Sequence, residues 1–294
     1  MTIRHALPSE LDAIAALVAG LQAYGETHMA LFGESRDDIA AEIRAWGPAW
    51  HEQSLVAEGE RHELVGFVGV EADPELERGW IYGPLVGLPH WDEAAELLLR
   101  RALADLLPDG ARDLELVGDD ENVRLAELAR SHGFERRTPS LVLELHRSAA
   151  SRLPPAEVAP VEPAQHAAVA ALHDALFTDT YFSGEQLVDQ HVRGEAVVLA
   201  LVEQGALTGY AAGRLDPAGE GHVDFVGVSE ERRSEGRGGR LVAAICAILL
   251  QSARSKVALV VYLDNAPALR VYERLGFVEA RRVVGYRRRP ESPS

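Results

Sequence analysis

Apolar residues recur along the second half of the chain with strand and helix periods in alternation. Runs rich in Val, Leu and other strand-forming residues predict strands at 157–161, 196–202, 207–215, 222–228 and 257–263, and one or two more within 278–288. Apolar residues at helical spacing predict helices at 163–176, 184–191, 238–253 and 266–275. Because 257–263 is almost purely apolar, we expect it to be a buried strand. The alternation indicates an α/β (α+β) fold in which helices flank a mixed central sheet.

The first half of the chain repeats landmarks of the second half. Asn122, Gly133 and Phe134 stand 143 residues before Asn265, Gly276 and Phe277. One constant offset at three positions predicts an internal duplication. Residues 148–156 are small, contain two prolines and show no period, which is typical of a linker. We therefore expect two tandem domains, at 1–147 and 157–294, joined by the linker 148–156.

Composition narrows the class of protein further. The formal net charge is −17, of which residues 1–150 carry −15 and the rest −2. Such a balance argues against nucleic acid as a partner, since a basic face is the usual footprint of a nucleic-acid-binding protein. It suits a cationic partner as well as a solvated acidic surface. The longest apolar run, at 241–250, is too short to cross a membrane, which takes about 18 residues.

The cysteine and histidine content bears on metal and location. Cys246 is the only cysteine, so neither an internal disulfide nor a thiolate zinc cluster is expected. No two histidines stand at the spacing of a helical ligand pair, so we expect no metal site. These features predict a cytoplasmic protein, and they leave a monomer and a homodimer equally open.

A Gly-rich and Arg-rich loop joins the strand at 222–228 to the helix that begins near 238. It contains Arg233-x-x-Gly236-x-Gly238, followed by Gly239. Glycines allow a ligand to approach the backbone closely, and the start of a helix favours negative charge. The pattern is neither a Walker loop nor a dinucleotide fingerprint. Taken alone it predicts an anion site, although a helix start without any ligand has the same composition.

A second segment gives the loop a specific context. After the strand at 257–263 come Asn265, Tyr272 and the pair Gly276-Phe277. Together, the loop and this segment resemble the GNAT superfamily of acetyl-CoA-dependent N-acetyltransferases, in its tandem two-domain form. The resemblance covers most of residues 157–288, and the first half shares it in degraded form. It implies acetyl-CoA, and hence coenzyme A as product, as the co-substrate of the second domain.

The resemblance also implies roles for single residues. Backbone groups of Val226 and Val228 would contact the pantetheine arm, and Asn265 would contact the cofactor close to it. Tyr272 would protonate the leaving thiolate, for which a phenol is a suitable acid. The pyrophosphate would be held by the Arg233 side chain and by the loop amides of Ser234, Glu235, Gly236, Arg237, Gly238 and Gly239.

The acceptor amine must lose a proton before it attacks a thioester. By the strand period of two, His222 and Asp224 share a face with Val226 and Val228, which makes them candidates for the base. His222 has the more suitable ordinary pKa, whereas Asp224 would orient it or hold an ammonium group. Alternatively, both side chains simply meet solvent at the start of a strand. Glu220 is a reserve candidate.

The first domain is expected to be inactive. Where the second half has its Gly loop, the first half has Asp92 and Glu93, whose charge would repel a pyrophosphate. The position of Tyr272 is held by Ala129. The sequence thus predicts direct acetyl transfer from acetyl-CoA to a primary amine in a ternary complex, at one site in the second domain. The acceptor, a small molecule or a peptide, stays open, and a non-catalytic acyl-CoA-binding sensor or interaction module is the alternative.

Overall fold

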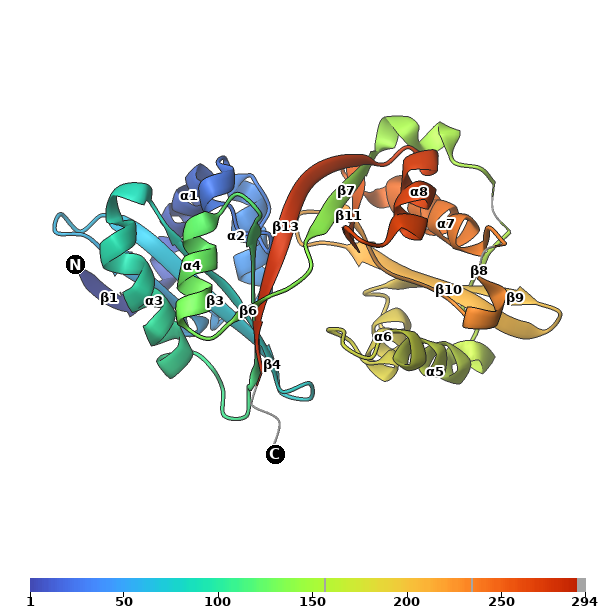
Figure 1. Cartoon of the computed structure of the whole chain (residues 1–294), viewed down its shortest axis with the longest axis horizontal. Helices are drawn as coiled ribbons and strands as arrows, with labels where there is room; N and C mark the ends of the chain where they lie inside the picture. The colour runs from blue at the N-terminus through green and yellow to red at the C-terminus, as the bar shows by residue number, and fades with distance from the viewer. Residues whose placement is uncertain (156, 234, 290–294) are drawn as a thin grey trace. The chain divides into compact units, whose positions relative to one another are not determined.

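The computed structural model describes residues 1–155, 157–233 and 235–289 (Figure 1). The chain divides into two compact units. Unit 1 comprises Met1–Pro139 and the chain from Arg282 on, and unit 2 comprises Ser140–Arg281. This division differs from the expected domains, because the strand that follows Pro139 pairs within unit 2 and the end of the last strand pairs within unit 1.

Unit 1 is a sheet with helices on both faces. Its strand order is β1-β2-β3-β4-β5-β13, and β6 also pairs with β13. A Cβ at Gly66 would meet Leu98 of α3, and one at Gly69 would meet Trp46, next to α2, so α2 and α3 cover opposite faces. The strands are β1 Thr2–His5, β2 Ser54–Glu58, β3 Leu64–Asp73, β4 Arg78–Val86, β5 Asp113–Asp119, β6 Glu135–Arg136 and β13 Val278–Arg288. The helices are α1 Leu11–Gln22, α2 Arg36–Ala45, α3 Trp91–Asp105 and α4 Val123–Ser131.

Unit 2 has the same kind of architecture. Its strand order is β13-β7-β12-β11-β10-β9-β8, and β11 and β12 run parallel. In Figure 1, α5 and α6 lie on one side of β10 and α7 and α8 on the other. The strands are β7 Ser140–His146, β8 Ala159–Pro160, β9 Val197–Glu203, β10 Ala206–Leu215, β11 Gly221–Val228 and β12 Lys256–Tyr262. The helices are α5 His166–Leu176, α6 Gly184–Val192, α7 Arg237–Ser252 and α8 Ala266–Leu275. The expected fold class, a mixed sheet flanked by helices, is confirmed.

Two apolar layers hold the helices of unit 2 on the sheet. The layer below α7 and α8 contains Ile245, Val257 and Leu259, and the layer below α5 and α6 contains Val169 and Tyr210. Cys246 lies in the first layer and is fully buried, and burial raises the pKa of its thiol to about 12. The thiol is therefore protonated at neutral pH and has a packing role.

The duplicated landmarks adopt the same local structure in both units. Asn122 caps α4 and Asn265 caps α8, each accepting a bond from the amide three residues later. After each helix come a glycine of positive φ and then a phenylalanine. The amide of this phenylalanine donates to the Ala129 carbonyl at 3.0 Å in unit 1 and to the Tyr272 carbonyl at 3.1 Å in unit 2. Ala129 therefore stands at the position of Tyr272, which supports the duplication.

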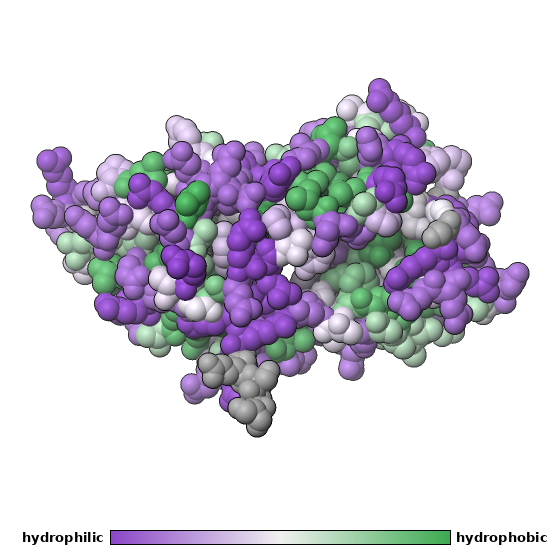
Figure 2. Space-filling view, in the orientation of Figure 1, coloured by the Kyte–Doolittle hydropathy of each residue, from purple (hydrophilic) through white to green (hydrophobic). Residues whose placement is uncertain are grey.

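The surface is largely polar. Polar and charged side chains cover most of the face in Figure 2, and apolar residues gather there in separate patches. Within the described ranges, no helix is long and apolar enough to cross a membrane.

Candidate functional site

The parallel strands β11 and β12 of unit 2 pair over a short distance and then diverge. Their register runs only from Gly221 beside Val257 to Val223 beside Leu259. On its other edge, β12 pairs with β7 along its whole length. Where the strands part, Val260 and Tyr262 are 52% and 55% exposed. The predicted burial of this strand is wrong for Val260 and Tyr262, which lie on the face opposite to that of the buried Leu259 and Val261.

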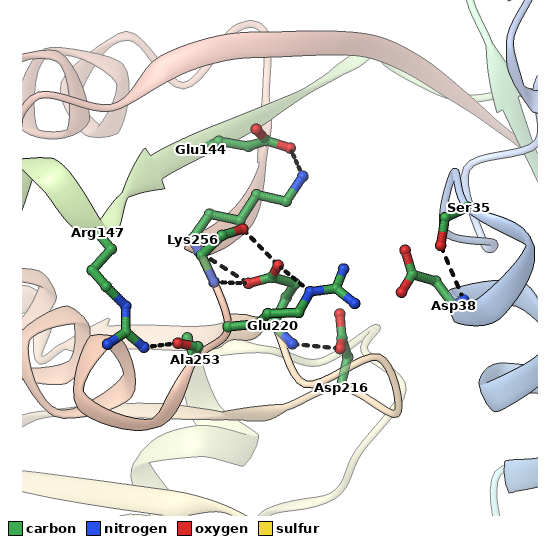
Figure 3. Close-up of polar contacts among 10 residues, drawn as sticks. Ser35, Asp38, Glu144, Arg147, Asp216, Glu220, Ala253 and Lys256 are labelled. Carbon is green, nitrogen blue, oxygen red and sulfur yellow. Dashed lines mark hydrogen bonds and ion pairs between the residues drawn. The ribbon is translucent and has the colours of Figure 1, made fainter.

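Glu220 fixes the closed end of this gap (Figure 3). Its carboxylate accepts hydrogen bonds from the amides of Ser255 and Lys256, at 2.8 and 2.9 Å, and from the Ser255 hydroxyl at 2.6 Å. Arg254 donates to it at 3.2 Å. Burial alone would raise the pKa of Glu220, but these bonds outweigh it and lower the pKa below its ordinary value. The reserve candidate for a base thus has a structural role: it holds the start of β12 beside β11.

A β-bulge in β11 places the predicted catalytic residues of this strand on two opposite faces of the sheet. Opposite β10, Val223 pairs with Gly213 and Phe225 with Ala212, so Asp224 is the extra residue. An extra residue shifts the alternation of side chains by one position. The prediction that His222 and Asp224 share a face with Val226 and Val228 is therefore wrong.

Val226 and Val228 lie on the face covered by α7 and α8. Both pack against the apolar layer there, as does Tyr272 of α8. The Tyr272 ring lies 5.5 Å, between centroids, from that of Phe277. Burial raises the pKa of Tyr272 to about 12, so its phenol carries a proton at neutral pH. The candidate acid and the candidate arm-binding strand therefore pack against the same apolar layer, on one face of the sheet.

His222 and Asp224 lie on the α5/α6 face. The Asp224 side chain is only 3% exposed, and its Oδ1 accepts bonds of 3.1 Å from both Tyr181 and Arg214. The Asp224 carboxylate is thus engaged in an ion pair with Arg214 and in a hydrogen bond from Tyr181. Burial lowers the pKa of His222 below its ordinary value, an effect that Asp224 only partly offsets. The imidazole is therefore neutral near pH 7 and able to accept a proton.

The backbone of the predicted anion loop borders open space at its glycines. Gly236 has a φ of 77°, a conformation that favours glycine, and a Cβ at either Gly236 or Gly238 would meet open space. A Cβ at Gly239 would only touch Val271, at 3.6 Å. Helix α7 starts at Arg237, so its first amides point into this open region. Ser234 lies outside the described residues.

The arginines of the loop differ in availability. The Arg233 side chain is 55% exposed, and its contacts with the described residues are long ones, of 3.5 Å, to Val228 and Glu230. Arg237 is buried and donates to Glu203 at 2.8 and 2.6 Å, and Glu235 lies 2.7 Å from it. Arg233 is thus available for an anion, whereas the Arg237 and Glu235 side chains bind each other and only their backbone groups remain available.

Asn265 has a structural role that does not require a ligand. Its side chain accepts a bond of 3.3 Å from the amide of Ala268. Asn122 makes the same bond in unit 1, at 3.0 Å to Leu125, although that unit lacks the Gly loop. Capping therefore accounts for this asparagine in both units, and its contact with a cofactor stays a prediction.

The matching gap in unit 1 is filled by the chain itself. Strands β4 and β5 pair from Arg78 to Ile81 and then part. There Met29, fully buried, pairs with Gly118 of β5, and flanking backbone bonds of 2.9 and 3.1 Å close the contact. Gln22 exchanges two bonds of 2.8 Å with the backbone of Met29. The sequence does not reveal the role of this segment, because nothing in the composition of the segment distinguishes it from an ordinary loop.

Comparisons with known proteins identify the family. Residues 166–277 match the family model described as Acetyltransferase (GNAT) family. This part of the chain belongs to the GNAT acetyltransferase family. It contains the diverging strands, the Gly loop and Tyr272.

The similar sequences agree with this assignment. The chain is 36% identical over 93 residues to a mycothiol acetyltransferase of Clavibacter sepedonicus, and 44% identical over 57 residues to one of Corynebacterium aurimucosum. These matches span 32% and 19% of this chain, and only 30% and 19% of those proteins.

Solved structures match over the full length. A GCN5-related N-acetyltransferase from Sphaerobacter thermophilus superposes with a TM-score of 0.77 at 19% identity, covering 100% of this chain and 97% of that one. A tandem GNAT protein from the clavulanic acid biosynthesis pathway gives 0.66 at 17% identity, covering 100% and 99%. At these identities the similarity shows a shared fold, which includes the tandem arrangement.

The described residues also bear on metal chemistry. Over the described ranges, no group of three or more His, Cys, Asp or Glu side chains could hold a metal ion.

Proposed function

We propose that unit 2 transfers an acetyl group from acetyl-CoA to a primary amine by direct attack in a ternary complex. The observation that carries this proposal is the contrast between the two gaps. In unit 2, β11 and β12 part and leave open backbone beside the Gly loop, whereas in unit 1 the segment around Met29 occupies the same place. Open backbone of this kind offers hydrogen bonds to the amide groups of a pantetheine arm.

The residues of unit 2 suit each part of acetyl-CoA. The α7 amides, the loop glycines and Arg233 would bind the pyrophosphate, because helix starts and guanidinium groups favour anions. Val226 and Val228 would bind the arm through their backbone. This placement brings the thioester close to Tyr272, on the same face of the sheet.

The reaction balances with two protein groups. The amine approaches from the α5/α6 face, and His222 takes its proton, directly or through water, as nitrogen attacks the carbonyl carbon. The new C–N bond forms as the C–S bond breaks, and the electron pair leaves with sulfur. Tyr272 gives its proton to that thiolate, and this proton is available because the phenol is protonated at neutral pH.

Substitution of Tyr272 tests this proposal. For Tyr272→Phe we expect a fall in kcat of about 10²-fold or more, with little change in affinity for coenzyme A, because only the transferred proton is lost. Coenzyme A binding by calorimetry and thiol release with a panel of amines measure the two quantities. Tyr24→Phe is the control, since Tyr24 is 68% exposed in unit 1.

The alternative function, a non-catalytic acyl-CoA-binding sensor, predicts a different outcome. The protein would then bind coenzyme A but release no thiol with any amine, and Tyr272→Phe would change nothing. An enzyme with the site proposed here binds one coenzyme A per chain. A stoichiometry of two would contradict the assignment of the filled gap in unit 1.

A further inference from the structure

Arg214 lies in a row of residues that crosses the sheet on the α5/α6 face. Arg214 of β10 pairs in register with His222 of β11, which pairs in turn with Ala258 of β12. Residues directly opposite each other share a face, with Cβ atoms about 4.5–5.5 Å apart. The next register position along β11 and β12 is the last before these strands part. A guanidinium group therefore stands beside the candidate base, close to the gap.

Asp224 holds this guanidinium in place. It receives one bond of 3.1 Å from Arg214 Nη1 while its other partner, Tyr181, is fixed by the aromatic packing of the α5–α6 loop. The Tyr181 ring lies 5.1 Å from that of Phe225, between centroids. His173, fully buried, bonds the Phe182 carbonyl at 2.9 Å and so fixes the same loop. The carboxylate is thus immobile, and it orients the arginine attached to it.

Most N–H groups of the Arg214 guanidinium stay available to a ligand. A guanidinium has five N–H groups, and the described part of the chain supplies one acceptor to them, Asp224. The Arg214 side chain is 33% exposed, against 3% for Asp224. Arg237 shows the contrasting case, because it is buried and several acceptors occupy its fork. Arg214 has the exposure and the spare donors of a ligand-binding arginine.

We infer that Arg214 binds an anionic group of the acceptor, so that the substrates of this site are amines carrying a nearby carboxylate or phosphate. This inference rests on the proposed function. His222 takes the proton of the amine while Arg214, its cross-strand neighbour, binds the anion. Because the two side chains are neighbours, the amine and the anion are separated by only a few bonds, as in an amino acid or a short aminoalkyl phosphate.

Matched acceptors test this inference. Each amine is compared with its anionic counterpart: ethylamine with β-alanine and with aminoethyl phosphate, and glycinamide with glycine. For the wild type we expect kcat/KM to be at least about 10-fold higher for the anionic member of a pair, since a bidentate guanidinium–anion contact is strong. The two anions distinguish a carboxylate from a phosphate acceptor.

Variants then assign the preference to Arg214. For Arg214→Gln we expect the preference to fall toward unity while the KM for acetyl-CoA stays unchanged, and Arg214→Lys should retain part of it because the charge remains. Arg193→Gln is the control, since Arg193 is an exposed arginine of the same unit paired with Glu195. Thermal unfolding of each variant checks that a lost preference is not lost folding.

Calorimetric binding of the same acceptors to the protein saturated with coenzyme A gives a second readout. The inference is overturned if neither turnover nor binding favours an anionic member, or if Arg214→Gln keeps the full preference. Failure of the proposed function looks different, because then no amine releases thiol from acetyl-CoA, whatever its charge.

Discussion

Glu220 and His222 stand two positions apart, yet their surroundings give them opposite chemistry. Glu220 receives hydrogen bonds from three consecutive residues, Arg254 to Lys256, which hold it as a charged structural group. His222 is half-buried, and its partial burial lowers its pKa so that it stays neutral near pH 7. From sequence alone both were candidates for the base. The surrounding donors, which come from residues more than thirty positions away, decide between them.

The pH dependence of the rate tests His222. Because its pKa lies below the ordinary value of 6.5, the imidazole is neutral and active at pH 7, and the rate should fall only as pH drops through that lower pKa. In His222→Asn we expect a lower rate, by about 10²-fold, and no such acid limb. The measurement is kcat/KM between pH 5 and 8, with the exposed His62 replaced by Asn as a control. An unchanged acid limb in His222→Asn would exclude this residue as the base.

Replacement of Glu220 by Gln should destabilise the fold. Gln has one acceptor oxygen and brings two donors toward groups that are themselves donors, so we expect a loss of about 1–3 kcal/mol at pH 7. The pKa of Glu220 is lowered on folding, so the stability it contributes is present above pH 4.5 and is lost as pH falls through the folded value.

The difference between wild type and Glu220→Gln should therefore shrink below pH 4.5. Urea unfolding at pH 7 and pH 4 measures it, with the exposed Glu60→Gln as the matched control. An equal loss at both pH values would show that the charge of Glu220 does not contribute.

At the scale of elements, the sequence predicted bounds better than faces. Helix α8 has the predicted limits, because Asn265 caps its start and Gly276 ends it. Ser183 and Gln186 form a capping box at the start of α6, next to the predicted start of that helix. The prediction of which β11 side chains share a face was wrong, because a period of two assumes a strand without a bulge. A bulge depends on the pairing with β10, which the sequence of β11 does not contain.

The hairpin between β9 and β10 holds the end of the Gly loop and the start of α7 in place. Glu203, at the end of β9, binds Arg237 with one carboxylate oxygen and Arg240 with the other, at 3.0 Å. The bond from Arg237 lowers the pKa of Glu203, which therefore stays charged. Both arginines belong to the first turn of α7, so the hairpin holds the helix start in the orientation that the loop amides need.

For Glu203→Gln we expect the KM for acetyl-CoA to rise several-fold with kcat nearly unchanged, because a mobile loop binds its ligand less tightly while the chemistry is untouched. Arg237→Lys should have a similar effect, and the double variant should add little, since both substitutions break one interaction. Steady-state kinetics with varied acetyl-CoA give the values, and Glu185→Gln on α6 is the control. Equal falls in kcat and in kcat/KM would argue for a different role of this ion pair.

At the scale of the whole chain, the duplicated landmarks occur in two units whose corresponding gaps differ. The repeat was readable because Asn, Gly and Phe recur at one offset, and these residues are needed to begin and end a helix. The charges at the start of α3, Asp92 and Glu93, distinguish the first half from the Gly-rich start of α7, and the inactivity that they predict for unit 1 stays a prediction. The filled gap in unit 1 could not be predicted from the sequence, because the roles of Met29 and Gln22 depend on where the fold places them.

The division of the strands between the units was equally hidden, since hydrogen-bonded partners far apart in the sequence leave no local pattern. Val284 of β13 pairs with Gly118 of β5 and is fully buried in the core of unit 1. Val284→Ala should therefore destabilise unit 1, by about 1–3 kcal/mol for the lost methyl groups, although it lies near the end of the sequence. Val278→Ala, in the same strand but 52% exposed, should have little effect.

Hydrogen exchange followed by mass spectrometry separates the two units in the full-length protein. In Val284→Ala, peptides from β4 and β5 should exchange faster, whereas peptides from α7 and β10 should keep their protection, because their layers do not include Val284. If instead α7 loses protection as much as β5, the two units unfold together, and the end of β13 stabilises the whole chain as one cooperative structure.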